Sequence, residues 1–273
     1  MQVKTDIPIT ITRIKKHRNV TYLLTVGSDA KTIRGEIYGY RTGIMYLLPA
    51  KGSEIINVCK HASPECIRVC LNTAGRGQFN STQLARLNRT ILFTSYKHEF
   101  WYMLIQNIEA LKRDAVRRGL IPVIRLNGLS DIPWEKVKIK GTQHDGLTIF
   151  QAYPELIFYD YSKYPYGERS SETLPQNYHL TYSYSEKTTS EIFQDNLDNG
   201  RNVAVVFNVC EYDNKGKHFI KCTCPLPNQW RGYDVISGDD SDIRFNDPQG
   251  VIVGLHAKGE ARFVDSGFII KLD

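Results

Sequence analysis

The chain lacks the features of an exported or membrane-embedded protein. Residues 1–8 contain no apolar signal core followed by small residues. No segment reaches the run of about 18 apolar residues that is needed to span a bilayer. We therefore expect a soluble protein of the cytoplasm, where thiols stay reduced. The six cysteines should then be free thiols or ligands rather than disulfide partners.

Two sequence motifs that would indicate a particular function are incomplete in this chain. Residues 237–247 carry four aspartates, but they lack the glycine and the terminal glutamate of a calcium-binding loop. We expect a turn in which Arg244 pairs with these carboxylates, with a divalent-cation site as the alternative. The abundant tyrosines have no histidine–hydrophobic–histidine motif beside them, which argues against a tyrosine nickase of the rolling-circle kind.

The composition is that of a folded, mildly basic protein. Hydrophobic residues make up 41% of the 273 residues and aromatic residues 11%, which is enough to build a core. The formal net charge of +6 favours an anionic partner. The length suits one large α/β domain or two small domains.

Five short apolar runs after residue 120 predict buried strands, each ending in polar residues. They are residues 121–126, 156–161, 178–183, 203–207 and 251–255. Apolar residues at three- and four-residue intervals predict two helices over residues 80–119, broken near residues 95–98, and another helix over residues 188–199. Strands that alternate with helices indicate an α/β fold with a parallel sheet, arranged as a partial (β/α) barrel.

The first fifty residues have a different pattern. Short apolar runs at residues 7–11, 20–26, 37–40 and 44–48 alternate with turns, and a proline and a glycine then break the chain. We predict a small β-rich N-terminal extension over residues 1–50. The α/β partial-barrel domain should then occupy residues 51–273.

Three cysteines, Cys59, Cys66 and Cys70, lie within twelve residues. Thiolates are good ligands for zinc and for iron–sulfur clusters, so we predict that these three cysteines bind metal. Three protein ligands would leave one iron of a [4Fe–4S] cluster open to a substrate or cofactor. Buried free thiols are the alternative.

A structural zinc site would need a fourth ligand. His61 lies in the same loop, and Cys210, Cys222 and Cys224 would have to be brought near by the fold. Cys222 and Cys224 alone are a weak pair, because alternate residues of a strand face opposite sides. The spacing of the three loop cysteines matches neither the common zinc fingers nor the ferredoxins.

The turn that follows the cysteines, Gly75, Arg76 and Gly77, precedes a predicted helix. Backbone amides and one guanidinium in such a turn suit an anion, so we predict a role in cofactor binding. A tight turn with a purely structural role is the alternative.

Polar residues gather where the predicted strands end, which is where parallel α/β folds place their chemistry. We predict that Arg125 and Asp131 take part in catalysis and that Asn127 and Ser130 bind a cofactor. The alternative for Asp131 is a helix cap ahead of Pro133.

The next two strands end in Lys163 and Ser183. We predict that Lys163 is a catalytic residue and that Ser183 binds the cofactor. Many tyrosines lie between Tyr153 and Tyr184, with lysine and arginine among them. They predict a surface on which the bases of single-stranded nucleic acid stack, or else ordinary core packing.

Several motifs along the chain resemble the bacteriophage "gene product 88" family. The resemblance rests on residues 35–40, 46–50, 57–59, 62–63, 66, 70–71, 74–77, 125–131, 134–135, 159–163, 238–239, 242, 244, 254–255 and 257–259. It implies a phage or prophage origin and a role in the cytoplasm of the host bacterium. It does not imply a particular reaction.

A more distant resemblance is to radical S-adenosylmethionine enzymes, which carry three cysteines on the loop after a first strand. The cysteine spacing here departs from theirs, and their glycine–glycine–glutamate signature is missing unless Asn127 and Gly128 with Ser130 and Asp131 replace it. The resemblance implies an iron–sulfur cluster, with S-adenosylmethionine as its cofactor.

These observations lead to three functional hypotheses. The first is an iron–sulfur or other metal protein that performs radical-type chemistry on nucleic acid or nucleotides. The second is a zinc-stabilised protein, not an enzyme, that binds single-stranded nucleic acid during phage replication. The third is an interaction protein that targets a host factor, with its cysteines simply buried. The oligomeric state does not follow from the sequence.

Overall fold

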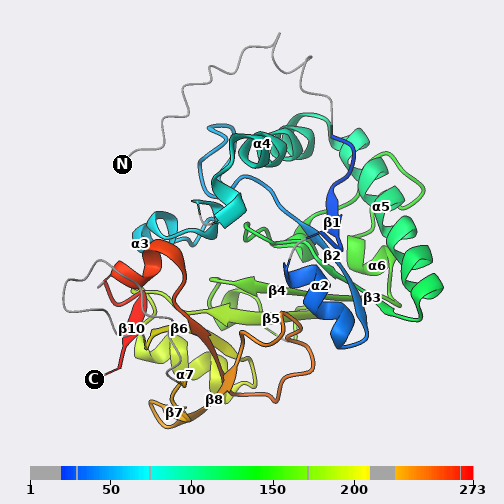
Figure 1. Cartoon of the computed structure of the whole chain (residues 1–273). Coiled ribbons are helices and arrows are strands. Elements are labelled where there is room, and N and C mark those ends of the chain that lie inside the picture. Colours follow the sequence, from blue (N-terminus) through cyan, green and yellow to red (C-terminus); the bar gives the residue numbers. More distant parts are fainter. Residues whose placement is uncertain are drawn as a thin grey trace.

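The computed structural model describes residues 20–28, 30–73, 75–170, 172–209, 225–264 and 266–272. The described chain forms an open sheet with helices on both of its faces (Figure 1). The predicted strand at residues 7–11 lies outside the described residues, as do Cys210, Cys222 and Cys224.

One sheet runs through the centre of the described chain. Its strands are β1 (Leu24–Val26), β2 (Tyr40–Met45), β3 (Ile121–Arg125), β4 (Ile157–Ser162), β5 (Tyr178–Ser183), β6 (Val203–Asn208), β7 (Gln229–Trp230), β8 (Tyr233–Ser237), β9 (Ile252–His256) and β10 (Ile269–Lys271). Their order is β1-β2-β3-β4-β5-β6-β9-β8-β7, and β10 also pairs with β6. All five strands predicted after residue 120 are present.

The strands from β2 to β6, followed by β9 and β8, are parallel neighbours. The two ends of the sheet are antiparallel pairs, β1 with β2 and β8 with β7. Within the described chain the end strands β1 and β7 do not pair with each other, so the sheet stays open. This confirms the predicted α/β fold with a partial-barrel parallel sheet.

The α-helices of the described chain are α2 (Ala30–Ile37), α3 (Pro64–Arg68), α4 (Asn80–Ser95), α5 (Lys97–Arg118), α6 (Ile149–Ala152) and α7 (Ser190–Asp198). The predicted break between two long helices is confirmed at Tyr96, and α5 ends at Gly119 with a φ of 67°. None of the helices in the described segments combines the length and the apolar character needed to cross a bilayer.

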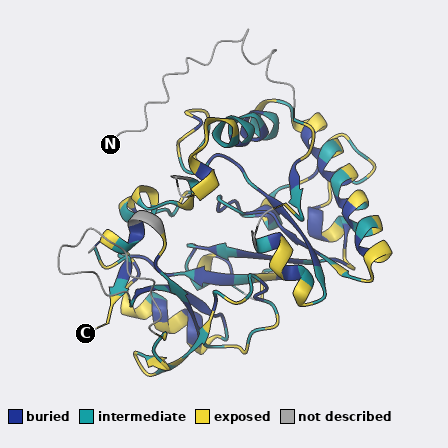
Figure 2. Cartoon of the chain, viewed as in Figure 1, coloured by how far each residue is buried: buried dark blue, intermediate teal, exposed yellow. Residues whose placement is uncertain are grey.

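Helix α5 builds the largest part of the core against β1 to β4. Its apolar residues Phe100, Leu104, Ile108 and Leu111 recur at helical intervals and are almost fully buried. The Phe100 ring packs against Phe93, Trp101 and Trp134 at centroid distances of 5.1, 5.3 and 6.2 Å. Figure 2 shows the resulting pattern, with buried strands and a helix that exposes one side.

Helix α2 and residues 239–247 cover the opposite face of the sheet. Arg34 donates to the carbonyl of Asp239 at 2.5 Å, and the Lys31 ammonium lies 3.2 Å from Asp242. Under this cover Ile243 packs with Val123 and Tyr159. Both faces of the central strands are therefore shielded, as is usual for a parallel sheet.

Helix α2 was not predicted, and the expectation of a strand at residues 37–40 is only partly right. The helix ends at Ile37, a turn follows, and β2 begins at Tyr40. A Cβ atom on Gly35 would lie 2.7 Å from Thr42 Oγ1, so this glycine lets α2 approach the sheet closely. That tertiary contact leaves only a weak trace in the sequence.

The predicted division at residue 50 remains a prediction. Within residues 20–50, β1 and β2 form the expected antiparallel pair. The other edge of β2 pairs in parallel with β3 of the following segment. The described part of the predicted extension thus belongs to the same sheet as residues 51–273.

The packing of α5 makes a prediction about stability. Replacing Phe100 with alanine should lower the free energy of unfolding by about 3–5 kcal/mol, because it leaves a cavity among three aromatic rings. Urea denaturation measures the change. Tyr102→Ala on the exposed side of the same helix is the matched control and should change stability by less than about 0.5 kcal/mol. Equal losses for both variants would contradict this account of the core.

Candidate functional site

The cysteine loop follows β2 and reaches over the carboxyl ends of the neighbouring strands. The Cys59 thiol accepts a hydrogen bond from the Ala50 amide at 3.3 Å and donates one to the Leu129 carbonyl, in the loop after β3, at 3.4 Å. One residue earlier, the carbonyl of Val58 accepts from the Asp131 amide at 2.7 Å. The loops after β2 and β3 are thereby joined at the cysteine.

The short helix α3 carries Cys66. Ser63 caps it by accepting from the Cys66 amide at 3.2 Å, and Pro64 occupies its first turn. Glu186, from the loop after β5, accepts from the Ser63 hydroxyl at 2.6 Å and from the Glu65 amide at 3.1 Å. A single carboxylate from another strand end therefore fixes the start of the helix that carries Cys66.

The three thiols lie in half-buried surroundings within electrostatic reach of one another. Burial, aided by the nearby Cys70, Asp131 and Cys66 and opposed by the Ala50 amide, raises the pKa of Cys59 to about 12. Burial also raises the pKa of Cys66, whereas the Lys163 ammonium lowers it. The thiols are thus protonated in the metal-free protein, and binding a metal would release their protons.

The donor chemistry suits a soft metal or a cluster, but the thiols are not arranged as ligands of one ion. Among the described residues, no group of three or more histidine, cysteine or acidic side chains is close enough to hold a metal ion. Binding would have to draw the cysteine loop together. The ring of His61, the proposed fourth zinc ligand, packs on Tyr164 at 4.1 Å, and its Nε2 lies 3.7 Å from Glu168.

Lys163 directly follows β4, and its ammonium is held beside the cysteine loop. It donates to the carbonyl and the hydroxyl of Ser183, both at 3.0 Å, and to the carbonyl of Tyr184 at 3.1 Å. Burial lowers the pKa of Lys163, an effect that Cys66 and Asp131 oppose. The structure thus brings together the predicted residues Lys163 and Ser183.

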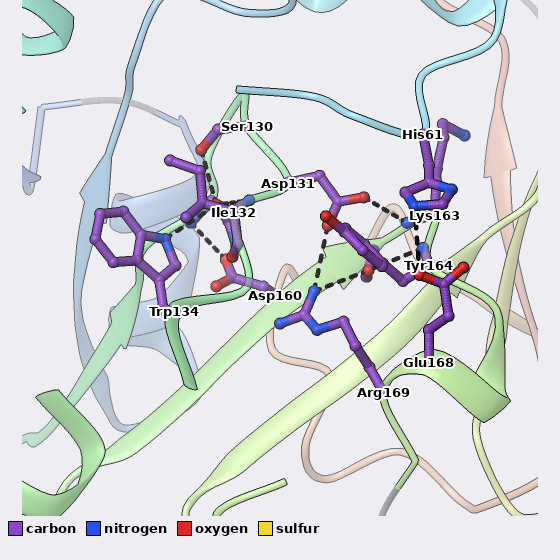
Figure 3. Close-up of polar contacts among 12 residues, drawn as sticks. His61, Ser130, Asp131, Ile132, Trp134, Asp160, Lys163, Tyr164, Glu168 and Arg169 are labelled. Carbon is purple, nitrogen blue, oxygen red and sulfur yellow. Dashed lines mark hydrogen bonds and ion pairs between the residues drawn. The ribbon is translucent and has the colours of Figure 1, made fainter. Parts of the chain in front are cut away.

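Asp131 joins this group to a second polar network (Figure 3). Its carboxylate accepts from the Lys163 amide at 2.8 Å and lies 3.3 Å from the Arg169 guanidinium. Arg169 also donates to both carboxylate oxygens of Glu135 at 2.8 Å. The alternative role of Asp131 as a helix cap is wrong, because the next helical turn, Trp134–Lys136, has Pro133 at its N-cap position and no side-chain cap.

Asn127 and Ser130 shape the loop after β3. The Asn127 side-chain oxygen accepts from the Ser130 hydroxyl at 2.8 Å, from the Ile132 amide at 3.0 Å and from the Trp134 indole at 3.1 Å. Both predicted cofactor ligands are therefore engaged with their own loop. Their role in cofactor binding stays a prediction, and any such contact would have to compete with these bonds.

Arg125 lies on the face of β3 that residues 239–247 cover, opposite the face that packs against α5. It donates to Asp242 at 2.7 Å and stacks on Tyr161 at 4.8 Å. The Arg125 guanidinium and Lys31 hold the pKa of Asp242 below its usual range despite burial. Nearby, the Arg244 guanidinium lies 3.2 Å from Asp247, so the predicted pairing with a carboxylate is present as an ion pair without hydrogen-bond geometry.

The turn at Gly75, Arg76 and Gly77 has a structural explanation. A Cβ atom on Gly77 would lie 2.7 Å from the Asn72 carbonyl, so the backbone there has no room for a side chain. The Gly77 carbonyl accepts hydrogen bonds from Gln83 and Arg86 of α4. Arg76 is exposed on the cysteine loop, and its predicted role in cofactor binding stays a prediction.

Most tyrosines between Tyr153 and Tyr184 belong to the core rather than to a surface. The buried ones are Tyr153, Tyr159, Tyr164, Tyr178, Tyr182 and Tyr184. Their rings are not available for stacking on nucleic acid bases, so the predicted tyrosine surface is wrong for these six. Core packing, the alternative, accounts for them.

No site role was predicted from the sequence for Glu186, Arg169 or the buried Asp160. Asp160 accepts from the Asn127 amide at 2.8 Å and from the Tyr178 hydroxyl at 2.9 Å, and it is fully buried. The one sequence signal for Asp160 was the presence of a charged residue in the middle of an apolar strand. Burial raises the pKa of Asp160 to about 7, although Arg125 and these donors oppose the shift.

This raised pKa sets the sign of a pH dependence. Between about pH 4 and pH 7 the unfolded chain has lost the Asp160 proton while the folded protein still holds it, so stability falls as the pH rises. Asp160→Asn should flatten this fall, by up to about 1.4 kcal/mol for each pH unit. Urea denaturation at pH 5 and pH 7 measures the slope. Asp198→Asn, an exposed change on α7, should keep the wild-type slope, and an unchanged slope in Asp160→Asn would contradict the assignment.

Comparison with known proteins identifies the family of the chain. The model of the family described as "Gene product 88" matches residues 15–272. No curated protein and no solved structure matches the chain, so the resemblance to radical S-adenosylmethionine enzymes gains no support from them. The family match covers nearly the whole sequence and confirms the first of the two resemblances. The chain belongs to the gene product 88 family.

Proposed function

We propose that the protein binds an iron–sulfur cluster through Cys59, Cys66 and Cys70 and uses it for radical-type chemistry on a nucleotide or nucleic acid. One observation carries the proposal. Three thiols of a single loop lie over the carboxyl ends of parallel strands, beside the half-buried Lys163. In parallel α/β folds, this edge of the sheet is where chemistry is performed.

The charges near the loop support thiolate ligation. Three thiolates would bring three negative charges into half-buried surroundings, and an unpaired buried charge is costly. A bound metal centre and the Lys163 ammonium would both offset them. The bonds to Ser183 and Tyr184 hold Lys163 in place for this role.

Three protein ligands would leave one iron of a [4Fe–4S] cluster open to a cofactor such as S-adenosylmethionine, whose chemistry with the cluster is radical formation. A cavity of about 260 Å³ opens beside the cysteine loop, bordered by Lys60, Asp131 and Tyr164. It supports the proposal by offering a small molecule space along residues 56–60 of the cysteine loop, although none of the three cysteines lines it. Asp131 borders it while holding the Lys163 amide.

Exposed cations on the same loop support an anionic substrate. Lys51, Lys60, Arg68 and Arg76 are all exposed, and the whole chain carries a net charge of +6. Phosphates of a nucleotide or of single-stranded nucleic acid would suit this surface. The proposal places the phage protein at work in the host cytoplasm.

The cluster is tested by anaerobic preparation followed by iron, sulfide and zinc analysis with a visible absorption spectrum. Iron and sulfide should both be present, and Cys59→Ser, Cys66→Ser or Cys70→Ser should each lower the bound iron severalfold because a ligand is lost. Cys210→Ser, outside the loop, is the control and should keep full iron. Zinc without sulfide would favour the zinc alternative. A preparation that contains neither iron nor zinc would overturn both the cluster proposal and the zinc alternative.

Nucleic acid binding is tested by fluorescence anisotropy with a single-stranded oligonucleotide at several salt concentrations. Lys60→Gln combined with Arg76→Gln should reduce the slope of log affinity against log salt by about 1.4, since each lost phosphate contact to a single strand contributes about 0.7. Lys97→Gln with Arg113→Gln, two exposed cations of α5, is the matched control. An unchanged slope in the loop variant would remove this surface from the proposal.

A further inference from the structure

A second cavity lies far from the cysteine loop along the strands. Its volume is about 380 Å³, and it opens at the amino ends of β5 and β6, whereas the cysteines lie over the carboxyl ends. Two arginines line it, Arg201 and Arg244, together with one carboxylate, Asp247. The proposed cluster chemistry makes no use of this part of the molecule.

Arg201 is a buried cation whose hydrogen bonds within the described chain go to neutral groups. The residue is only 7% exposed. Its guanidinium donates to the Arg169 carbonyl and, at 3.5 Å, to the Asn196 side-chain oxygen, and it stacks on Tyr166 at 4.8 Å. Among the described residues no carboxylate forms an ion pair with it. Burial, together with the charge of Arg169, lowers the pKa of Arg201 to about 10.

Arg244 has unused hydrogen-bonding capacity in the same cavity. It is 6% exposed, and its Nη2 donates to the Ser241 carbonyl at 2.6 Å. Its Nε has no hydrogen-bond partner in the described chain, and its Nη1 lies 3.2 Å from Asp247 without hydrogen-bond geometry. A buried donor without a partner costs about 1–3 kcal/mol, which a ligand oxygen would recover.

We propose that this cavity is a second binding site, for a small molecule that carries a phosphate or carboxylate group. Guanidinium groups recognise both oxyanions through paired hydrogen bonds. The charges support an anion, because two buried cations face one carboxylate. The volume exceeds that of a bare oxyanion and falls in the range of about 300–1,000 Å³ typical of ligand pockets. The amides of Gln176 and Gln249 line the cavity and add neutral polar groups for the rest of such a ligand.

Isothermal titration calorimetry of the full chain tests the site, with inorganic phosphate and malonate as probes and sodium chloride at matched ionic strength as the blank. Saturable binding of phosphate alone or of malonate alone supports the proposal and identifies the oxyanion, and binding of both supports the shared class. Arg244→Gln should weaken binding about tenfold or more by removing a charged donor, an effect of about 1.4 kcal/mol.

A second variant keeps the test valid if Arg244→Gln does not fold. Gln249→Glu places a negative charge on an exposed residue that lines the cavity, and it should also weaken binding about tenfold. Gln106→Glu, the same change on the exposed side of α5, should bind like the wild type. The proposal is overturned if neither probe binds saturably, or if Gln249→Glu and Gln106→Glu bind equally well. Binding should persist in Cys59→Ser, which separates this site from the cluster proposal.

Discussion

Asp131 ties together the loops that follow three neighbouring parallel strands. Its amide bonds Val58 in the cysteine loop, and its carboxylate bonds the Lys163 amide and lies against Arg169. A buried carboxylate must be satisfied by donors, so these loops are held to one geometry. This residue therefore holds both the backbone beside Cys59 and the backbone amide of Lys163.

A second carboxylate holds the other half of the cysteine loop. Glu186 binds the start of α3 through Ser63 and Glu65, and it comes from the same loop as the Ser183 and Tyr184 groups that hold Lys163. The cysteine loop is therefore fixed from the strand ends on both sides. Burial raises the pKa of Cys59 to about 12, so this frame holds the Cys59 thiol in its neutral form.

Much of the fold could be predicted because its signals are local. The apolar runs of the central strands and the periodic residues of α4 and α5 are written into consecutive residues, and the structure confirms them. Helix α2 could not be predicted in this way, since it depends on the close approach of Gly35 to Thr42. The strands β7, β8 and β10 were missed as well, and β7 and β10 have only two and three residues, which carry little pattern.

The sequence by itself determined the positions of the central strands and of the helices α4, α5 and α7, the three thiols of one loop, and the polar residues at the strand ends. Only the tertiary structure decided what those polar residues contact. Arg125 meets Asp242 across 117 residues of chain, the Lys163 ammonium donates to Ser183, and Asn127 turns inward to its own loop. The spacing of apolar residues indicates which face of a strand or helix a side chain lies on. Ion pairs and buried hydrogen bonds, however, form between residues distant in sequence. Their partners are chosen by packing, which no local pattern encodes.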